Sequence, residues 1–280
     1  MRSDSLYKIC NLENIMLDVV DIGANPVDGD PPYKKLLLEE RVNVCGFDSD
    51  AAAYQKLMES AGRYEKYFPY AVGDGTELTF YTYAASGLNS LFELDQEMGK
   101  YFWGFEQWGV PIKSFPVQTR RLDNITEITN IDMLKIDVQG AEKMIIENGI
   151  KKLESALLIQ TEIEFFPLYK NQPLFSDVDL LLRNMGFILH TMIDVNVRAV
   201  RPLNINNDAS AGVNQFMWAD AVYIRDFRKF SELATEKLLK LAILTHDIYR
   251  SYDIALHCLT EYDKRMNTNL MVQYAHAISG

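Results

Sequence analysis

Cysteine and histidine are scarce in this sequence. Its 280 residues include three cysteines, Cys10, Cys45 and Cys258, and four histidines, with no CxxC motif and no Cys/His spacing typical of zinc ligands. An odd number of unpatterned cysteines predicts reduced thiols and argues against a disulfide framework or a zinc site. We therefore expect a cytoplasmic protein.

Long apolar runs and an excess of basic residues are also missing. The longest apolar stretches, such as residues 15–22, are broken by acids and are too short to span a bilayer. Residues 1–14 lack the apolar segment of a signal peptide. The formal net charge is −11, which disfavours a nucleic-acid partner because such affinity rests largely on Lys and Arg. We expect neither a membrane nor nucleic acid among the partners.

The residues that are present predict a globular α/β protein. Hydrophobic residues make up 48% of the chain, and from residue 17 onward short apolar segments alternate with amphipathic ones. This pattern is typical of parallel strands joined by crossover helices. Strands are expected at residues 17–22, 42–47, 67–72, 78–83, 133–138, 156–163, 187–193 and 216–225, and helices at 32–40, 50–61, 141–148 and 176–185. The aromatic-rich, irregular segment 87–118 is expected to be a lid over the ligand.

The pattern changes after Asp226. Residues 230–249 and 251–265 have helical periodicity, no further strand follows, and residues 227–280 carry seven Lys and Arg against six Asp and Glu. We predict an α/β domain over residues 1–226 and a near-neutral helical extension over residues 227–280. Its apolar face should pack on the α/β domain, and a homodimer interface is the alternative. That face contains Leu238, Leu241, Ala242 and Ile248.

A nucleotide-binding turn is expected after the first strand. Gly23 lies in the segment Asp21-Ile-Gly-Ala-Asn-Pro-Val-Asp-Gly29, where a glycine permits a tight turn and the helix that follows presents its N-terminus to an anion. A tight turn without a ligand is the alternative. The second strand ends in Asp48, 25 positions beyond Gly23, where an acid typically binds both ribose hydroxyls. Asp48 as a helix cap is the alternative, but Asp50 is the better cap.

The glycine spacing distinguishes between cofactors. The turn lacks the G-x-G-x-x-G pattern that lets backbone approach a pyrophosphate. A cofactor with a ribose and a free carboxylate but no pyrophosphate fits better, which favours S-adenosylmethionine (SAM) over NAD and disfavours a dehydrogenase.

Several ordered blocks then resemble the FkbM family of methyltransferases, over roughly residues 15–226. The blocks are Asp18-Val-Val-Asp-Ile-Gly-Ala-Asn-Pro, Gly46-Phe-Asp48, Ala71-Val-Gly-Asp74, Leu134-Lys-Ile-Asp-Val-Gln-Gly-Ala-Glu142, Glu162-Ile-Glu-Phe-Phe-Pro-Leu-Tyr169, Gln172-Pro173 and Trp218-Ala-Asp-Ala-Val-Tyr223. The resemblance implies a Rossmann-like, seven-stranded class I methyltransferase sheet with a terminal antiparallel strand. It also implies methylation of hydroxyl groups, as in macrolide tailoring and sugar or glycan modification. The segment Tyr249-Arg-Ser-Tyr-Asp253 resembles an extension in one branch of the family.

One position departs from the family pattern. The motif on the fourth strand often reads Asp-Val-Glu-Gly in the family, whereas this chain has Gln139 in the place of the glutamate. The change removes a negative charge and argues against this position as a base or a metal ligand.

The resemblance also implies the residues that bind SAM. Asp21, Gly23 and Asn25 would hold the methionine end, and Asp48 the ribose. Val72 and Asp74 would frame the adenine, with plain core packing and an Asp-Gly-Thr turn as the respective alternatives.

Methyl transfer to a hydroxyl requires aligned reactants and a proton acceptor. The candidates at strand ends are Asp137, Glu162, Glu164 and His190, and we favour Glu162. Alternate strand residues share a face, so Glu162 and Glu164 are a base with a substrate-holding partner or ligands for Mg²⁺. The alternative is a solvated edge or ion pairs with Lys170 and Arg183. His190 lies between apolar neighbours and is more typical of a packed histidine.

Three further residues are candidates for substrate binding. Tyr169, Gln172 and Trp218 are expected to face a sugar, although aromatic residues at such positions are often core. The sequence thus predicts a SAM-dependent O-methyltransferase acting on a sugar, glycan or secondary metabolite. The alternative is a non-catalytic SAM-fold module that recruits a partner through its tail, but acids at three strand ends favour the enzyme.

Overall fold

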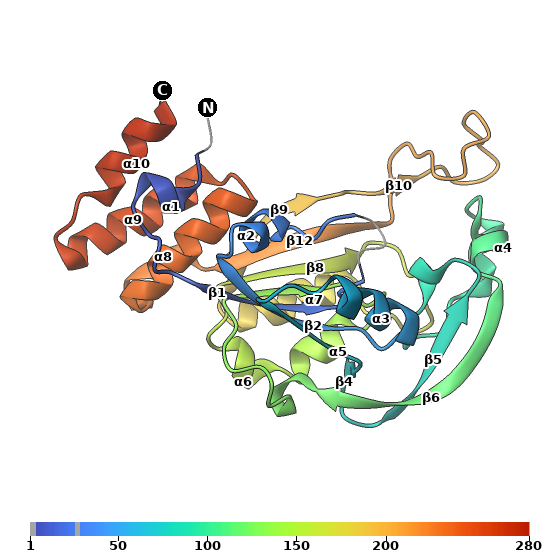
Figure 1. Ribbon diagram of the computed structural model, residues 1–280. Coiled ribbons are helices and arrows are strands. Elements are labelled where there is room, and N and C mark those ends of the chain that lie inside the picture. Colours follow the sequence, from blue (N-terminus) through green and yellow to red (C-terminus); the bar gives the residue numbers. More distant parts are fainter. Residues whose placement is uncertain (1–3, 26–28, 280) are drawn as a thin grey trace.

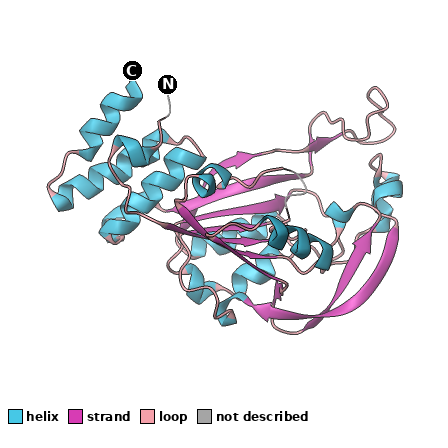
Figure 2. Ribbon diagram, in the orientation of Figure 1, coloured by secondary structure: helices cyan, strands magenta, loops and turns pink. Residues whose placement is uncertain are grey.

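A central twisted sheet organises the protein. The structure, a computed structural model, describes residues 4–25 and 29–279, so residues 26–28 of the turn after the first strand lie outside the described residues. The sheet has seven strands in the order β3-β2-β1-β7-β8-β12-β9, and β12 runs antiparallel to both of its neighbours. This arrangement confirms the predicted seven-stranded methyltransferase sheet (Figures 1 and 2). Its strands are β3 (Glu65–Phe68), β2 (Val42–Phe47), β1 (Leu17–Ile22), β7 (Met133–Ile136), β8 (Leu158–Glu164), β12 (Trp218–Arg225) and β9 (Phe187–Ile193).

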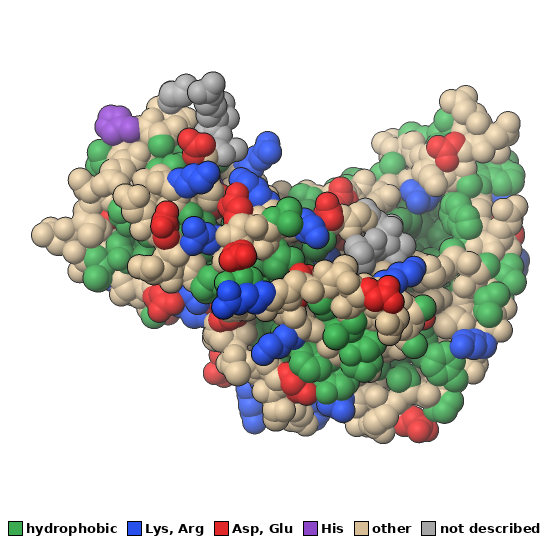
Figure 3. All heavy atoms as spheres, viewed as in Figure 1, with side chains coloured by type: hydrophobic (Ala, Val, Ile, Leu, Met, Phe, Trp, Pro, Cys, Tyr) green, Lys and Arg blue, Asp and Glu red, His purple; other side chains and the backbone are tan. Residues whose placement is uncertain are grey.

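Helices lie on both faces of this sheet because its strands carry apolar side chains on both sides. One face packs against α5 and α7, and the other against α1, α2, α8 and α9. The helices are α1 (Leu6–Ile9), α2 (Lys34–Leu38), α3 (Ala51–Ser60), α4 (Phe105–Trp108), α5 (Glu142–Glu147), α6 (Ile150–Leu153), α7 (Phe175–Asn184), α8 (Thr235–Ile243), α9 (Tyr252–Met266) and α10 (Leu270–Ser279). On the face in Figure 3, acidic and basic side chains are interspersed. Among the described residues, no helix has the length and apolar character needed to cross a bilayer.

The sheet face under the C-terminal helices is divided along the strands. Near the amino ends of the parallel strands and the carboxyl end of β12, its side chains are apolar and form one cluster with α1, α8 and α9; those on the sheet are Leu17, Val19, Val42, Val44, Met133, Leu158, Val222 and Ile224. Two residues further along the strands, the same face carries polar groups instead, since alternate residues share a face. Asp21, Lys135 and Gln160 lie side by side in one row of the sheet. The helical extension over residues 227–280, the tail, therefore packs on the apolar half of this face.

A smaller sheet replaces part of the predicted lid. Within residues 87–118 the structure has short helical turns and then β6 (Pro111–Arg121), which pairs with β5 (Glu77–Tyr83) and β4 (Ala71–Gly73). Residues 78–83 are thus not an edge of the main sheet, and residues 67–72 divide between β3 and β4 around Pro69. The sequence missed β6 because it contains two prolines and its residues are mostly exposed, without apolar alternation. The remaining strands are β10 (Val197–Arg198) and β11 (Gln215–Phe216), and the 3₁₀ turns are Ser86–Leu88, Gln96–Lys100, Leu122–Asn124 and Phe227–Glu232.

A buried ion cluster ties the tail to the sheet. Asp132, which is 0% exposed, lies 2.7 Å from Lys237 Nζ and 2.8 Å from Lys240 Nζ, and also accepts a hydrogen bond from the backbone N–H of Asp18. Burial alone would raise the pKa of Asp132, but hydrogen bonds from Lys237 and Lys240 hold that pKa below its usual range. The cluster is stabilising only while both signs of charge are present.

We expect Asp132→Asn to lower the free energy of unfolding by about 3–5 kcal/mol, because the buried Lys240 loses its buried counter-charge and retains only the exposed Glu236 at 3.5 Å. Because the folded pKa of Asp132 is depressed, its contribution is present above the unfolded pKa of about 3.9 and is lost as the pH falls through the folded value. Urea unfolding of both proteins at pH 7 and at acid pH measures this. Glu97→Gln, which breaks an exposed pair with Lys100, is the control and should leave stability unchanged; an equal loss in both variants would contradict the expectation.

Candidate active site

Two cavities meet at the carboxyl ends of the central strands. The first has a volume of about 350 Å³ and lies over β1, β2 and α3. The second has a volume of about 690 Å³ and lies over β1, β7, β8 and β12. Asn25 and Asp137 line both cavities. Two ligands bound in these cavities would therefore meet beside these two residues.

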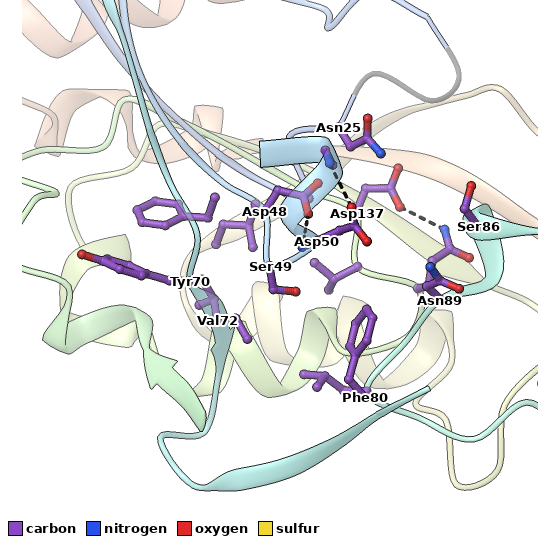
Figure 4. A pocket seen from close by; sticks show the side chains of 18 of the residues that line it. Asn25, Asp48, Ser49, Asp50, Tyr70, Val72, Phe80, Ser86, Asn89 and Asp137 are labelled. Atoms are coloured by element: carbon purple, nitrogen blue, oxygen red, sulfur yellow. Dashed lines mark hydrogen bonds between the residues drawn. The ribbon is translucent and has the colours of Figure 1, made fainter. Parts of the chain in front are cut away.

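Asp48 presents a carboxylate to the first cavity from the end of β2 (Figure 4). Its Oδ1 accepts a hydrogen bond of 2.8 Å from the backbone N–H of Asp50. Asp50 itself caps α3 through Ala52 and Ala53, as predicted, so Asp48 is not the cap. Burial raises the pKa of Asp48 to about 6. The carboxylate is thus ionised at neutral pH and poorly solvated, which favours a hydrogen-bonding ligand.

The turn after β1 brings the backbone close to β7. Gly23 has φ +80°, and a Cβ at this position would lie 1.9 Å from the carbonyl oxygen of Asp137. Only glycine fits here, and both Gly23 and Asn25 line the first cavity. Asp21 does not: its carboxylate lines the second cavity, where it accepts a hydrogen bond of 2.5 Å from the hydroxyl of Tyr33.

An apolar slot completes the first cavity. Phe47, Tyr70, Val72 and Phe80 line it, and Figure 4 shows Asp48 and Tyr70 on one side with Ser86 and Asn89 on the other. Such a flat apolar space beside polar groups suits a heteroaromatic ring.

Asp74, which was expected beside Val72, has a structural role. Its carboxylate accepts hydrogen bonds from the backbone N–H of Thr76 at 2.8 Å and from the hydroxyl of Thr76 at 2.7 Å. These hydrogen bonds lower the pKa of Asp74. The Asp-Gly-Thr turn, which was the alternative, accounts for this residue, and Asp74 does not line the first cavity.

A group of carboxylates lies where the two cavities meet. Gln139 Nε2 donates hydrogen bonds to Asp137 Oδ1 at 3.1 Å and to Glu162 Oε2 at 2.7 Å. Gln139 itself has φ +58°, a conformation that is uncommon outside glycine. Burial, followed by the charges of Asp137 and Glu164, raises the pKa of Glu162 well above its usual range. The amide of Gln139 therefore holds two carboxylates side by side, one of which has a high affinity for a proton.

Two further acids lie behind this pair. Glu142 is buried, accepts a hydrogen bond of 2.8 Å from the backbone N–H of Val138, and has a pKa raised by burial to about 7. Burial and the charge of Glu142 also raise the pKa of the buried Glu164. One carboxylate oxygen each of Asp137, Glu142 and Glu162 lies within 4.8 Å of the others. The expected ion-pair alternative for Glu162 and Glu164 is not observed, since Lys170 pairs with Glu93 and Arg183 with Asp179.

Five of the predicted residues lie outside both cavities, and Asp74 is one of them. Glu164 is buried, and the Tyr169 hydroxyl lies 3.1 Å from the carbonyl oxygen of Leu88 and 3.3 Å from Gln139 Oε1, either of which can accept its hydrogen bond. Gln172 Oε1 accepts from the backbone N–H groups of Leu168 and Tyr169 and shapes that loop. His190 contacts the tail, with Nε2 at 2.5 Å from Ser251 Oγ. Trp218, by contrast, lines the second cavity as expected.

The sequence did not single out the polar floor of the second cavity. Lys135, Gln160 and Asp220 line it together with Glu162. Burial alone would lower the pKa of Lys135, but Asp21 and Asp137 raise it, so Lys135 stays charged. A usable signal was present: Lys135 and Gln160 interrupt otherwise apolar strands, and buried polar residues require partners.

Comparison with known proteins identifies a family. Residues 21–189 match the methyltransferase FkbM domain family, which is more than half of the chain. The 2-O-methyltransferase NoeI of Sinorhizobium fredii (strain NBRC 101917 / NGR234) is 29% identical over 177 residues, which is 58% of this chain and 70% of that protein.

Solved structures are more distant. Magnesium protoporphyrin IX methyltransferase (ChlM) from Synechocystis PCC 6803 with bound SAM has a TM-score of 0.39 and 11% identity, over 79% of this chain and 76% of that chain. M. capricolum TrmK in complex with S-adenosylhomocysteine has a TM-score of 0.35 and 9% identity, over 94% and 96% of the respective chains. Likenesses of this size carry no inference about ligands. The family match and the sheet topology confirm the expected enzyme class, and the chain belongs to the FkbM methyltransferase family.

Proposed function

We propose that this methyltransferase transfers a methyl group from SAM to a hydroxyl group of a sugar, glycan or secondary metabolite. The observation that carries the proposal is the meeting of the two cavities at Asn25 and Asp137, beside Glu162. SAM supplies an electrophilic methyl group bound to a sulfonium. Methyl transfer is an in-line displacement, which requires cofactor and acceptor to approach each other from separate sites.

The first cavity has the groups that SAM needs. The Asp48 carboxylate would accept hydrogen bonds from the ribose hydroxyls, and the slot lined by Val72, Tyr70 and Phe80 would hold the adenine. Gly23 and Asn25 would hold the methionine end, which lies toward the second cavity. Asp21 lines the second cavity instead, where its carboxylate would hold the ammonium group of Lys135, 3.6 Å away.

The second cavity suits a polyhydroxylated acceptor. An aromatic side chain, Trp218, lines this cavity together with Gln160 and Asp220, and the Arg198 guanidinium lies over the Trp218 ring at 4.7 Å. An aromatic ring can pack on the C–H face of a sugar, while carboxylate and amide groups bind its hydroxyls. Glu162 would take the hydroxyl proton as the new O–C bond forms, a role that its raised proton affinity favours. The name of the 2-O-methyltransferase relative also supports a hydroxyl acceptor.

The proposal is tested with purified protein, isotope-labelled SAM and a panel of acceptors. The panel contains neutral methyl glycosides, oligosaccharides, other aliphatic alcohols, and amines as non-hydroxyl acceptors. Mass spectrometry is expected to detect the gain of one methyl group on a hydroxyl. Methylation of the amines alone would contradict the proposal.

Asp48→Ala is expected to weaken SAM binding by about 1.5–3 kcal/mol, roughly 10- to 150-fold, since a charged acceptor of the ribose hydroxyls is lost. Asp74→Ala is the matched control and should leave SAM affinity nearly unchanged, because Asp74 hydrogen-bonds its own turn. Calorimetry with SAM and with NAD measures both. Binding of NAD, or equal affinity in Asp48→Ala and wild type, would contradict the assignment.

The affinity for SAM should also depend on pH. The pKa of Asp48 is raised to about 6, so this carboxylate becomes protonated as the pH falls through that value. A protonated Asp48 has lost the negative charge that strengthens its hydrogen bonds. Wild-type affinity should therefore fall between about pH 7 and pH 5. The same titration in Asp48→Asn should be flat over this range.

A further inference from the structure

The tail has an unusual backbone where it meets the sheet. Helix α8 ends in a π-helical turn, Leu244–Ile248, and Arg250 then adopts a left-handed conformation with φ +56°. The backbone N–H of Ser251 donates to the carbonyl of Thr245 at 2.8 Å and closes this bend. π-Helical turns and left-handed non-glycine residues cluster at functional sites. Between these two features lies Tyr249.

Tyr249 reaches from the tail to the floor of the second cavity. Its hydroxyl donates a hydrogen bond of 2.7 Å to Gln160 Oε1. Gln160 Nε2 in turn donates a hydrogen bond of 2.5 Å to Asp220 Oδ2. Gln160 and Asp220 both line the second cavity, whereas Tyr249 does not. Two consecutive hydrogen bonds thus link the tail to the carboxylate of Asp220, which lines the proposed cavity for the methyl acceptor.

These two hydrogen bonds fix the orientation of the Gln160 amide. A tyrosine O–H is a donor when it binds a carbonyl oxygen, and burial raises the pKa of Tyr249, so this hydroxyl keeps its proton. Gln160 must therefore direct its oxygen to Tyr249 and its NH₂ group to Asp220. With the amide reversed, Gln160 Oε1 would meet the carboxylate of Asp220, and two acceptors would repel each other.

We propose that Tyr249 of the helical extension is a positioning residue of the acceptor cavity, which orients the Gln160 amide and thereby the Asp220 carboxylate. The proposal rests on the proposed function, because it takes the second cavity as the acceptor site. This role makes the tail part of the methyl-acceptor site, in addition to its packing on the apolar face of the sheet. The hydroxyl groups of the methyl acceptor would then bind to Asp220 Oδ1, whose position is fixed because Oδ2 accepts the hydrogen bond from Gln160.

The direct test is the titration of Asp220 in three variants. Protein labelled with [¹³C]aspartate is titrated by NMR, and the Asp220 carboxyl signal is assigned from Asp220→Asn. Tyr249→Phe removes the hydroxyl alone, and Gln160→Met removes the donor to Asp220. Gln160→Met is expected to raise the pKa of Asp220 by about one unit, as expected for the loss of one hydrogen bond to a charged group. Tyr249→Phe leaves that donor in place without fixing its direction, so it is expected to raise the pKa of Asp220 by a smaller amount. Tyr262→Phe, another half-buried tyrosine of the extension, is the control and should leave that pKa unchanged.

A purely structural role of Tyr249 gives a different result. Tyr249→Phe would then lower the thermal stability while the Asp220 titration matched wild type, and this outcome overturns the proposal. It is also overturned if Gln160→Met leaves the Asp220 titration unchanged. Neither the Asp220 titration nor the thermal stability depends on turnover. A failure of the proposed function would appear as absent SAM binding in calorimetry and is therefore distinguishable from a failure of this proposal. SAM affinity itself should be the same in Tyr249→Phe and wild type, since Tyr249 lies away from the first cavity.

Discussion

Glu162→Gln is expected to lower kcat by about 10²- to 10⁴-fold, the usual effect of removing a general base. The substitution keeps the shape of the side chain and an oxygen that can accept the hydrogen bond from Gln139, but it removes the ability to take a proton. Glu162 lines the second cavity and not the first, so SAM affinity should be retained. Turnover with labelled SAM and calorimetry measure the two effects separately.

The pH dependence gives a second measure of the same role. Burial and neighbouring carboxylates raise the pKa of Glu162, so its basic form is lost as the pH falls through a value well above the ordinary glutamate pKa of about 4.3. The rate of wild-type turnover should therefore rise with pH over that raised value. The residual activity of Glu162→Gln should not show this rise with pH.

Matched variants identify the base if it is misassigned. His190→Ala should be active, since His190 contacts Ser251 of the tail and lines neither cavity. Asp137→Asn tests a positioning role at the junction of the cavities. Normal turnover in Glu162→Gln together with an inactive Asp137→Asn would assign the base to Asp137. Activity that disappears with a chelator and returns with Mg²⁺ would make the carboxylates metal ligands, with the proton leaving from a metal-bound hydroxyl.

Deletion of residues 227–280 is expected to give an insoluble or unfolded protein. The tail helices form a buried cluster with the sheet, to which Leu238, Leu241 and Leu259 contribute. Each large apolar side chain contributes about 1.5–3 kcal/mol on burial. The cluster holds eight such side chains from the tail, so their combined contribution is as large as a typical total stability of about 5–15 kcal/mol; they are Phe230, Leu238, Leu239, Leu241, Ile243, Leu244, Ile254 and Leu259. Soluble yield, thermal unfolding and binding of an apolar dye measure the effect. The boundary at residue 226 is itself tested by this truncation.

Point variants test the packing of the tail on the sheet without removing the tail. Leu241→Ala, at a site that is 0% exposed, should lower the free energy of unfolding by about 2–5 kcal/mol. Leu180→Ala, on a helix surface that is 63% exposed, is the control and should have little effect. A truncated protein that is soluble, monomeric, equally heat-stable and active would make the tail a separate module. A change in oligomeric state alone would favour the homodimer alternative.

The sheet was predictable from the sequence because its strands are short, apolar and separated by amphipathic helices. The bounds of β1, β2 and β9 agree with the expected ranges. The small sheet was not predictable, since β6 pairs through its backbone while most of its side chains face solvent. Helix α10 was also missed, although Tyr274 is buried and Leu270, Met271 and Ile278 pack against the same cluster.

The two sides of the candidate site differed in how much the sequence revealed. Asp48, Gly23 and Asn25 follow strands directly, and their place at the sheet edge follows from the parallel topology. Gln160 and Asp220 depend instead on β12 lying antiparallel beside β8, a contact between segments 60 residues apart. Their partner Tyr249 comes from the tail. No local pattern specifies such distant pairings.

The cluster that joins Leu6 to the tail helices sets an order for folding during synthesis. Leu6, Leu17, Leu158 and Leu244 bury one another although they are far apart in the sequence. At ~5–20 residues per second, synthesis of residues 227–280 takes on the order of 3–10 s, during which the apolar half of the sheet face lacks the cover of α8 and α9. The nascent chain is then a substrate for chaperones that bind exposed apolar strands. Ribosomes stalled just after β12 should accumulate chaperone-bound chains, whereas ribosomes stalled on a linker placed beyond residue 280 should not.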